Sequence, residues 1–267
     1  MTQDKNIISV RSLVKRFGDR AVLDGVTADI PEGKITVIMG GSGCGKSTFL
    51  RHLIGLYQPD EGEILIDGQN IVGLSEKPMN LVKRKFGMLF QGSALFNSMT
   101  VGENVALPLR EHTDLSDEII GIIVKVKLEL VGLTGFENFM PHEISGGMKK
   151  RVALARAIAL DPKIVFYDEP GAGLDPITAS MIDQLILDLS RKLKITSVVV
   201  SHEMKSAFRI ADQMIVLHRG KVLEIGTSQQ IQETTNPYIR QFINGEPEGA
   251  IPFRQTSDAY LKGLLQS

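Results

Sequence analysis

Residues 40–48 carry the most specific chemical pattern in this sequence. The spacing Gly40-x-x-x-x-Gly45-Lys46-Ser47 is typical of a phosphate-binding loop, in which backbone N–H groups converge on phosphate oxygens. Lys46 would add positive charge at the β and γ phosphates, and the Ser47 hydroxyl could ligate Mg²⁺. A plain glycine-rich turn is the alternative, but the strand-like run before the loop and the helical spacing after it favour a nucleotide site. The expected nucleotide contacts are Gly40, Gly41, Ser42, Gly43, Cys44, Gly45, Lys46, Ser47 and Thr48.

Two adjacent carboxylates, Asp168 and Glu169, directly follow the apolar run 164–167. In an open α/β sheet, ligands collect at the carboxyl ends of the strands, where the phosphate-binding loop also lies. We therefore expect Asp168 to hold the Mg²⁺ shell and Glu169 to orient or deprotonate the attacking water. A pair of solvated carboxylates at a strand end is the alternative.

His202 follows another buried-strand pattern, residues 197–200, and is expected at the same edge of the sheet. A neutral imidazole there can hydrogen-bond a γ-phosphate and respond to its loss. Taken alone, such a histidine is more often an ordinary polar residue of a loop.

A second glycine-rich helix start occurs at Ser145-Gly146-Gly147-Met148. A helix N-terminus with glycines and a hydroxyl can bind an anion, and one nucleotide does not readily need two such surfaces from one chain. The alternative is a simple glycine turn in which Ser145 caps the helix.

The elements that must position these residues follow from hydrophobic periodicity. Residues 6–38 alternate in short pieces and predict an antiparallel sheet, whereas 34–39 is a continuous β-branched run typical of a strand buried on both faces. A helix is expected over 46–56. Between about 92 and 160 the periods become helical, and one helical face over 115–133 collects Ile119, Ile122, Ile123, Val126, Leu130 and Val131.

After this insertion, the α/β order returns. Strands at 164–167 and 197–200, joined by a helix over 179–193, form a βαβ unit and imply a parallel sheet. Residues 213–226 predict a hairpin about Arg219-Gly220. Residues 244–249 have linker composition, after which 258–265 could form a short amphipathic helix, although composition alone equally favours disorder.

Composition narrows the classes of protein. The chain has 267 residues with 43% hydrophobic content, enough for a sizeable core, and its 30 Lys and Arg nearly balance 31 Asp and Glu. There is therefore no electrostatic reason to expect nucleic acid as a ligand. A single cysteine, Cys44, excludes an internal disulfide and fits a reducing compartment, and no apolar run is long enough to span a bilayer. We expect a cytoplasmic protein.

Over about residues 6–230 the chain resembles the ATP-binding cassette (ABC) family, whose motifs occur here in the expected order. The resemblance implies an α/β fold with a P-loop NTPase (RecA-like) core, an N-terminal antiparallel β-subdomain and an inserted α-helical subdomain at about 92–160. It implies an ATPase domain over 1–243 and a C-terminal extension over 244–267. Its implied cofactors are ATP and Mg²⁺.

The same resemblance implies roles for individual residues. Phe17 would stack on adenine, Gln91 would join Mg²⁺ to the helical subdomain, Asp175 would belong to the D-loop, and His202 would be the switch histidine. Ser145, Gly146, Gly147 and Met148 would be the signature loop, which in this family completes the γ-phosphate site of a second, head-to-tail subunit. Met148 stands where glutamine is usual, which removes a side-chain amide that could reach the partner's nucleotide. In the D-loop, Gly173 stands where alanine is usual.

A narrower resemblance is carried by residues 89–96, 107–113 and 251–254, which are similar to ATPase subunits of Mla-type phospholipid transporters of Gram-negative inner membranes. It implies a homodimer on the cytoplasmic face of that membrane, working with an MlaE-like permease, an MlaD-like MCE-domain protein and an MlaB-like STAS-domain protein. The tail after Gly249 would then reach the partner cassette.

Other functions remain open at this point. The chain could serve another importer-like ABC system, or it could be a soluble ABC ATPase that acts on DNA or ribosomes. The latter proteins would carry a long coiled-coil insertion or two cassettes, and neither pattern is found. A GTPase should show Asn-Lys-x-Asp, which does not occur in the sequence.

Overall fold

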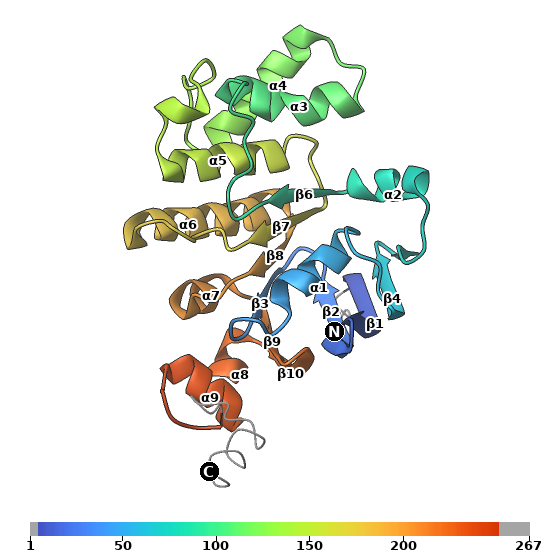
Figure 1. Cartoon of the computed structure of the whole chain (residues 1–267). Helices are drawn as coiled ribbons and strands as arrows, with labels where there is room; N and C mark the ends of the chain where they lie inside the picture. The colour runs from blue at the N-terminus through green and yellow to red at the C-terminus, as the bar shows by residue number, and fades with distance from the viewer. Residues whose placement is uncertain (1–4, 251–267) are drawn as a thin grey trace, which may run out of the picture.

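Two β-sheets organise the chain in this computed structural model, which describes residues 5–250 (Figure 1). The first sheet is antiparallel, with strand order β2-β1-β4-β5. Its strands are β1 (Asn6–Phe17), β2 (Arg20–Pro31), β4 (Glu61–Ile66) and β5 (Gln69–Asn70). The second sheet has the order β10-β9-β3-β8-β7-β6, and only the edge pair β9 and β10 is antiparallel. Its strands are β3 (Ile35–Met39), β6 (Phe86–Leu89), β7 (Ile164–Asp168), β8 (Thr196–Val200), β9 (Gln213–His218) and β10 (Lys221–Gly226).

The central strands are buried and mostly apolar because both faces of the larger sheet are covered. Successive side chains of a strand point to opposite faces, so Val37 of β3 joins one hydrophobic cluster and Ile38 joins the other. The cluster of Ile38 fills the space toward the antiparallel sheet, α1 and α2, and the cluster of Val37 packs under the remaining helices. This double burial accounts for the unbroken β-branched runs.

Helices surround the larger sheet and gather beyond one of its edges. Helices α3, α4 and α5 pack on one another next to β6, and α6 follows β7 (Figure 1). The helices are α1 (Lys46–Leu53), α2 (Glu76–Lys83), α3 (Val101–His112), α4 (Asp117–Leu130), α5 (Gly146–Ala157), α6 (Pro176–Leu193), α7 (Met204–Ile210), α8 (Ser228–Gln232) and α9 (Pro237–Asn244), with a 3₁₀ turn η1 (Pro141–Glu143). Among residues 5–250, no helix is both long and apolar enough to cross a bilayer.

The buried face of α4 differs from the apolar face in the sequence pattern. Ile120, Val124 and Leu128 are buried against the neighbouring helices. Most of the predicted apolar face is instead exposed, and Ile122 keeps 64% of its surface accessible. Because this helix has apolar residues on two faces, periodicity alone does not identify which face packs.

The structure confirms the N-terminal antiparallel sheet, the βαβ unit and the closing hairpin. Hydrophobic periodicity predicted no helix or strand over residues 57–91, which form β4, β5, α2 and β6. Residues 251–267, including the expected helix over 258–265 and the proposed arm, lie outside the described residues.

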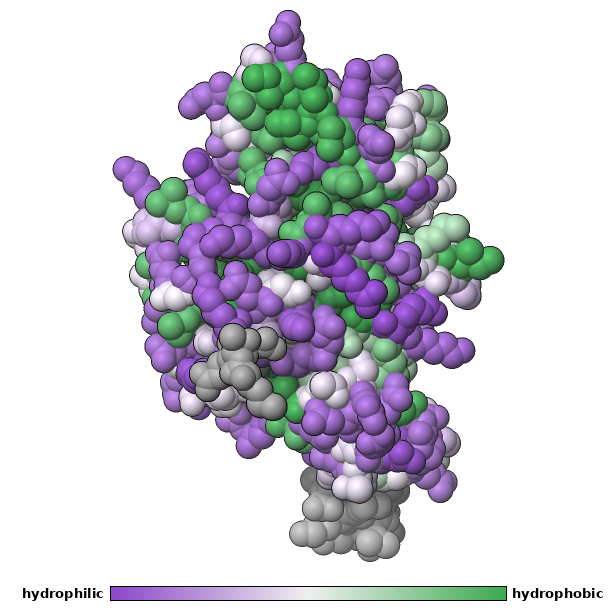
Figure 2. Space-filling view, turned by 180° about the vertical axis from the view of Figure 1, so that it is seen from behind, coloured by the Kyte–Doolittle hydropathy of each residue, from purple (hydrophilic) through white to green (hydrophobic). Residues whose placement is uncertain are grey.

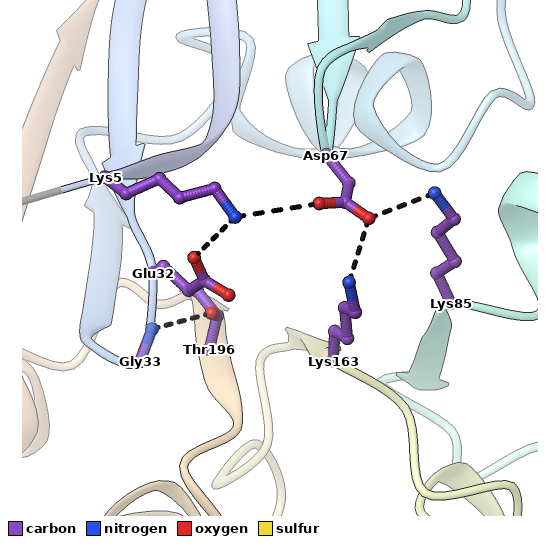
Figure 3. Close-up of polar contacts among 7 residues, drawn as sticks. All are labelled: Lys5, Glu32, Gly33, Asp67, Lys85, Lys163 and Thr196. Atoms are coloured by element: carbon purple, nitrogen blue, oxygen red, sulfur yellow. Dashed lines mark hydrogen bonds and ion pairs between the residues drawn. The ribbon is translucent and has the colours of Figure 1, made fainter.

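Asp67 joins the antiparallel sheet to the beginnings of two strands of the larger sheet (Figure 3). Its carboxylate accepts hydrogen bonds from Lys85 at 3.1 Å, just before β6, and from Lys163 at 3.0 Å, just before β7. Lys5, which is paired with Glu32 at 2.9 Å, approaches the same carboxylate at 3.9 Å. The hydrogen bonds from Lys163 and Lys85 lower the pKa of Asp67.

We expect Asp67→Asn to lower the free energy of unfolding by about 1 kcal/mol, or the melting temperature by about 2–4 °C, because the lysines lose their shared anion. Since the folded-state pKa of Asp67 is depressed, the stabilisation should be full above the ordinary aspartate pKa of about 3.9 and disappear as pH falls through the lower folded value. Thermal melting against pH measures it. Asp188→Asn, which breaks an exposed pair within α6, is the control and should change little.

Candidate nucleotide-hydrolysis site

The phosphate-binding loop connects β3 to α1 in a conformation that requires glycine. Gly40 and Gly45 have φ values of 149° and 110°, in the region that residues with a Cβ rarely adopt. A Cβ on Gly40 would also lie 2.1 Å from the carbonyl oxygen of Leu217, and one on Gly45 would lie 2.9 Å from that of Val22. The loop can therefore approach β9 and β2 closely only with glycine at these positions.

Lys46 lies within this loop and is 8% exposed. Its ammonium group donates to the carbonyl oxygens of Gly40 at 2.8 Å and Gly41 at 3.0 Å. These contacts hold the positive charge beside the start of α1, where the helix dipole also favours an anion. The predicted phosphate cradle is therefore present as a formed structure.

A cavity of about 720 Å³ opens at the loop and at the carboxyl ends of the neighbouring strands. Glu169, directly after β7, and His202, shortly after β8, line it together with the loop. Residues more than 150 positions apart in the sequence thus meet because β3, β8 and β7 are parallel neighbours. The lining residues are Arg20, Val22, Gly40, Gly41, Ser42, Gly43, Gly45, Lys46, Ser47, Thr48, Glu169, His202 and Phe242.

Two other polar residues of the predicted site contact the Glu169 carboxylate. Gln91 Nε2 donates to Glu169 Oε2 at 3.2 Å, and His202 Nδ1 lies 3.0 Å from Oε1. The backbone of Glu169 is left-handed, with φ 47°, and its N–H donates to the carbonyl of Val200 at 2.9 Å. Such a conformation is uncommon for a residue with a side chain and is held here by surrounding contacts. The arrangement fixes a carboxylate at the cavity, as a general base for water requires.

Asp168 and Glu169 together provide an electrostatic reason to bind a cation. Burial, followed by the neighbouring charge of Glu169, raises the pKa of Asp168. A divalent ion would relieve this repulsion, and Mg²⁺ is usually held by one or two carboxylates together with substrate phosphates. The described residues contain no cluster of three or more His, Cys, Asp or Glu side chains that could hold a metal alone. The donors therefore fit Mg²⁺ that arrives with a nucleotide.

Some predicted site residues do not line this cavity. Phe17 is 50% exposed at the end of β1 and contacts the Tyr57 ring edge-on at 5.9 Å. Asp175 caps α6, accepting from the N–H groups of Ile177 and Thr178 at 3.0 Å each. Ser145 caps α5 by accepting from Met148 N–H at 3.2 Å. Ser145, Gly146, Gly147 and Met148 are all absent from the cavity wall.

Four residues at or near the site were missed by the sequence analysis. Arg20, Val22 and Phe242 line the cavity, and Lys150 contacts the backbone of Gln91 and Glu169. None belongs to a motif with a spacing of its own. A lysine in the first turns of a polar helix is typical of a solvated face, so only the packing of α5 identifies Lys150 as buried.

The comparisons with known proteins agree with this geometry. Residues 23–172 match the family model for ABC transporters, and the chain therefore belongs to the ABC transporter family. Within that family it is an ATP-hydrolysing subunit. It is 44% identical to the intermembrane phospholipid transport system ATP-binding protein MlaF of Haemophilus influenzae, over 98% of this chain and all of that protein. It is also 44% identical to the probable ribonucleotide transport ATP-binding protein mkl of Mycobacterium leprae, over 94% of this chain and 72% of that protein.

Solved structures show the same fold. The dimeric post-hydrolysis structure of the ATP-binding cassette MJ0796 bound to ADP and Pi has a TM-score of 0.76 and 33% identity, covering 83% of this chain and 98% of that one. The structure of cbiO1 from Clostridium perfringens, part of the ABC transporter complex cbiONQ, has a TM-score of 0.80 and 27% identity, covering 99% and 100%. The expected ABC fold is confirmed.

We expect Glu169→Gln to leave ATP binding intact while lowering kcat by a factor on the order of 10² or more, because an amide cannot accept the proton of the attacking water. Steady-state ATPase assays and equilibrium ATP binding separate the two effects. Glu203→Gln, shortly after the neighbouring strand β8 and outside this cavity, is the control. Normal turnover by the Glu169 variant would remove Glu169 from the chemical step.

Phe17→Ala should weaken ATP affinity by about 1 kcal/mol, or roughly 5-fold, through loss of stacking on the base, with little effect on kcat. Tyr57→Ala removes the ring that contacts Phe17 but leaves Phe17 in place. It therefore distinguishes stacking of Phe17 on the base from packing between Phe17 and Tyr57. Binding titrations with ATP and with inorganic triphosphate provide the measurement. Equal losses for both ligands would reject Phe17 as the adenine platform.

Proposed function

We propose that this chain is the ATPase subunit of an Mla-type phospholipid transporter and that it hydrolyses ATP as a head-to-tail homodimer. The observation that carries the dimer is the separation of two anion-binding surfaces. The phosphate loop, Glu169 and His202 line one cavity, while the helix start at Ser145 lies outside it. A second copy that presents its Ser145 helix would enclose the exposed side of the γ-phosphate.

The described side chains assign the chemical roles in this proposal. Mg²⁺ would bind through Ser47, Asp168 and Gln91 and would supply charge neutralisation on the phosphates. Glu169 would accept a proton from the attacking water, with Gln91 and His202 fixing its two oxygens. Lys46 would hold the β and γ phosphates, and Asp175 would order the start of α6 at the dimer interface.

The phospholipid cargo is supported by relatives and by coverage. The chain spans all of the H. influenzae MlaF but 72% of the M. leprae mkl, at equal identity. The ribonucleotide cargo in the second name therefore has weaker support.

We propose an ATPase domain over 1–243 with a mobile helical part at about 92–160, and an extension over 244–267 that docks on the partner copy.

A groove between the larger sheet and α3 fits a permease. It has a volume of about 590 Å³, with apolar walls from Phe90, Phe96 and Leu107 and cationic groups from Arg84 and Arg156. Phe90 and Phe96 are 40% and 50% exposed and line the same groove, and contiguous accessible apolar surface of this kind marks protein-binding sites. We propose that an amphipathic cytoplasmic helix of an MlaE-like permease binds here, which would hold the chain on the cytoplasmic face of the inner membrane.

The exposed apolar face of α4 fits a second partner. Hydrophobic surface gathers at the end of the molecule formed by α3 and α4 (Figure 2). Its exposed members are Leu115, Ile119, Ile122, Val126 and Leu130. We propose that an MlaB-like STAS-domain protein covers this face, while an MlaD-like MCE-domain protein contacts the permease on the far side of the membrane.

Phe96→Asp tests the permease groove. We expect it to abolish co-purification of the permease and its phospholipid in mild detergent, while the ATPase activity of the isolated chain stays within about 2-fold, because a charge there disfavours burial of an apolar helix. Leu193→Asp, at a similarly exposed apolar residue at the end of α6, is the control and should retain the permease. Retention of the permease by Phe96→Asp would reject this docking site, and a co-purified permease without phospholipid would reject the cargo.

A further inference from the structure

Lys150 is a buried cation that the hydrolysis chemistry leaves without a role. It lies in the second turn of α5, two residues after Met148, and is 4% exposed. Burial of a lysine is costly unless its charge and donors are satisfied. Burial lowers the pKa of Lys150, whereas the neighbouring carboxylates Asp168 and Glu169 favour its charged form. The two neighbouring carboxylates therefore help to stabilise the charge of this buried side chain.

The ammonium group of Lys150 contacts the backbone of two residues of the hydrolysis site. It donates a short hydrogen bond to the carbonyl oxygen of Gln91 and a longer one, 3.5 Å, to the carbonyl oxygen of Glu169. The side chains of these same two residues are hydrogen-bonded to each other at 3.2 Å. Lys150 is thus hydrogen-bonded to the backbone of the same two residues whose side chains contact each other.

The helix that carries Lys150 also begins with the Ser145 loop. On the proposed function, that loop contacts the nucleotide of the partner copy, whereas Gln91 and Glu169 act on the chain's own nucleotide. We infer that Lys150 is a positioning residue that fixes Gln91 and Glu169 relative to the start of α5, so that one buried side chain connects the two nucleotide sites that each chain serves. This inference rests on the proposed dimer.

The test compares Lys150→Met with Lys149→Met in the purified full chain. Lys149 is the adjacent, less buried lysine, and no hydrogen bond or ion pair of its side chain is found in residues 5–250. We expect Lys150→Met to lower kcat on the order of 10- to 100-fold, since small misplacements of catalytic groups have effects of that size. ATP affinity, measured by equilibrium binding, should stay within about 2-fold, and Lys149→Met should match the wild type.

A double-mutant cycle with Gln91→Ala distinguishes positioning from a general loss of structure. If Lys150 acts through Gln91, the double variant should lose much less kcat than the product of the two single losses. Lys150→Arg, which keeps a charged donor, should recover part of the activity. If Lys150→Met does not fold, as judged by thermal melting, Lys150→Gln replaces it with the same expected loss, because the shorter amide cannot reach both carbonyls.

Three results would overturn the inference: a kcat for Lys150→Met equal to that of Lys149→Met, multiplicative losses in the cycle, or weakened ATP affinity with unchanged kcat. Failure of the proposed function has a different signature. In that case the wild-type chain itself would show no ATPase activity that depends on chain concentration, whatever residue occupies position 150.

Discussion

The negative charge of a bound triphosphate is the constraint on which the rest of the structure depends. It must be surrounded by N–H donors and cations that are fixed before the nucleotide arrives, because reorganising them during the reaction would forfeit their stabilisation of the transition state. The chain meets this need on one side with the glycine loop and Lys46, which is already hydrogen-bonded to Gly40 and Gly41. The helix start at Ser145 lies outside that cavity, and in the proposed dimer the other side would come from the Ser145 helix start of a second copy.

The hydrolysis site is also connected to the helical part of the chain. Glu169 is in contact with Gln91, whose segment runs from β6 toward α3, and Lys150 connects both residues to α5. The groove proposed to bind the permease is lined by residues on either side of Gln91, including Phe90 and Phe96. On the proposed function, a change in how the γ-phosphate is held would reach the permease through these adjacent residues.

Much of this architecture is predictable from the sequence, because backbone geometry and burial constrain residue type strongly there. Gly40 cannot carry a Cβ beside Leu217, and β3, β7 and β8 are buried on both faces and therefore mostly apolar. Residues 57–91 gave no clear period, since β4 and β6 are short and half-exposed. The burial of Lys150 and the packing face of α4 could not be predicted, for a common reason. Both depend on which helices pack together, and the sequence pattern of one helix does not identify its neighbours.

The shared nucleotide site can be tested most directly by mixing two inactive variants of the full chain. Lys46→Ala removes the phosphate-loop charge, and Ser145→Arg blocks the helix start that would face the partner. Each variant alone should lack ATPase activity, because every site in its homodimer is defective. In a mixed dimer, one site would pair the intact loop of the Ser145 variant with the intact helix start of the Lys46 variant, so the mixture should regain substantial activity. A mixture that forms dimers but stays inactive, or a Ser145→Arg chain that is fully active as a monomer, would contradict the account.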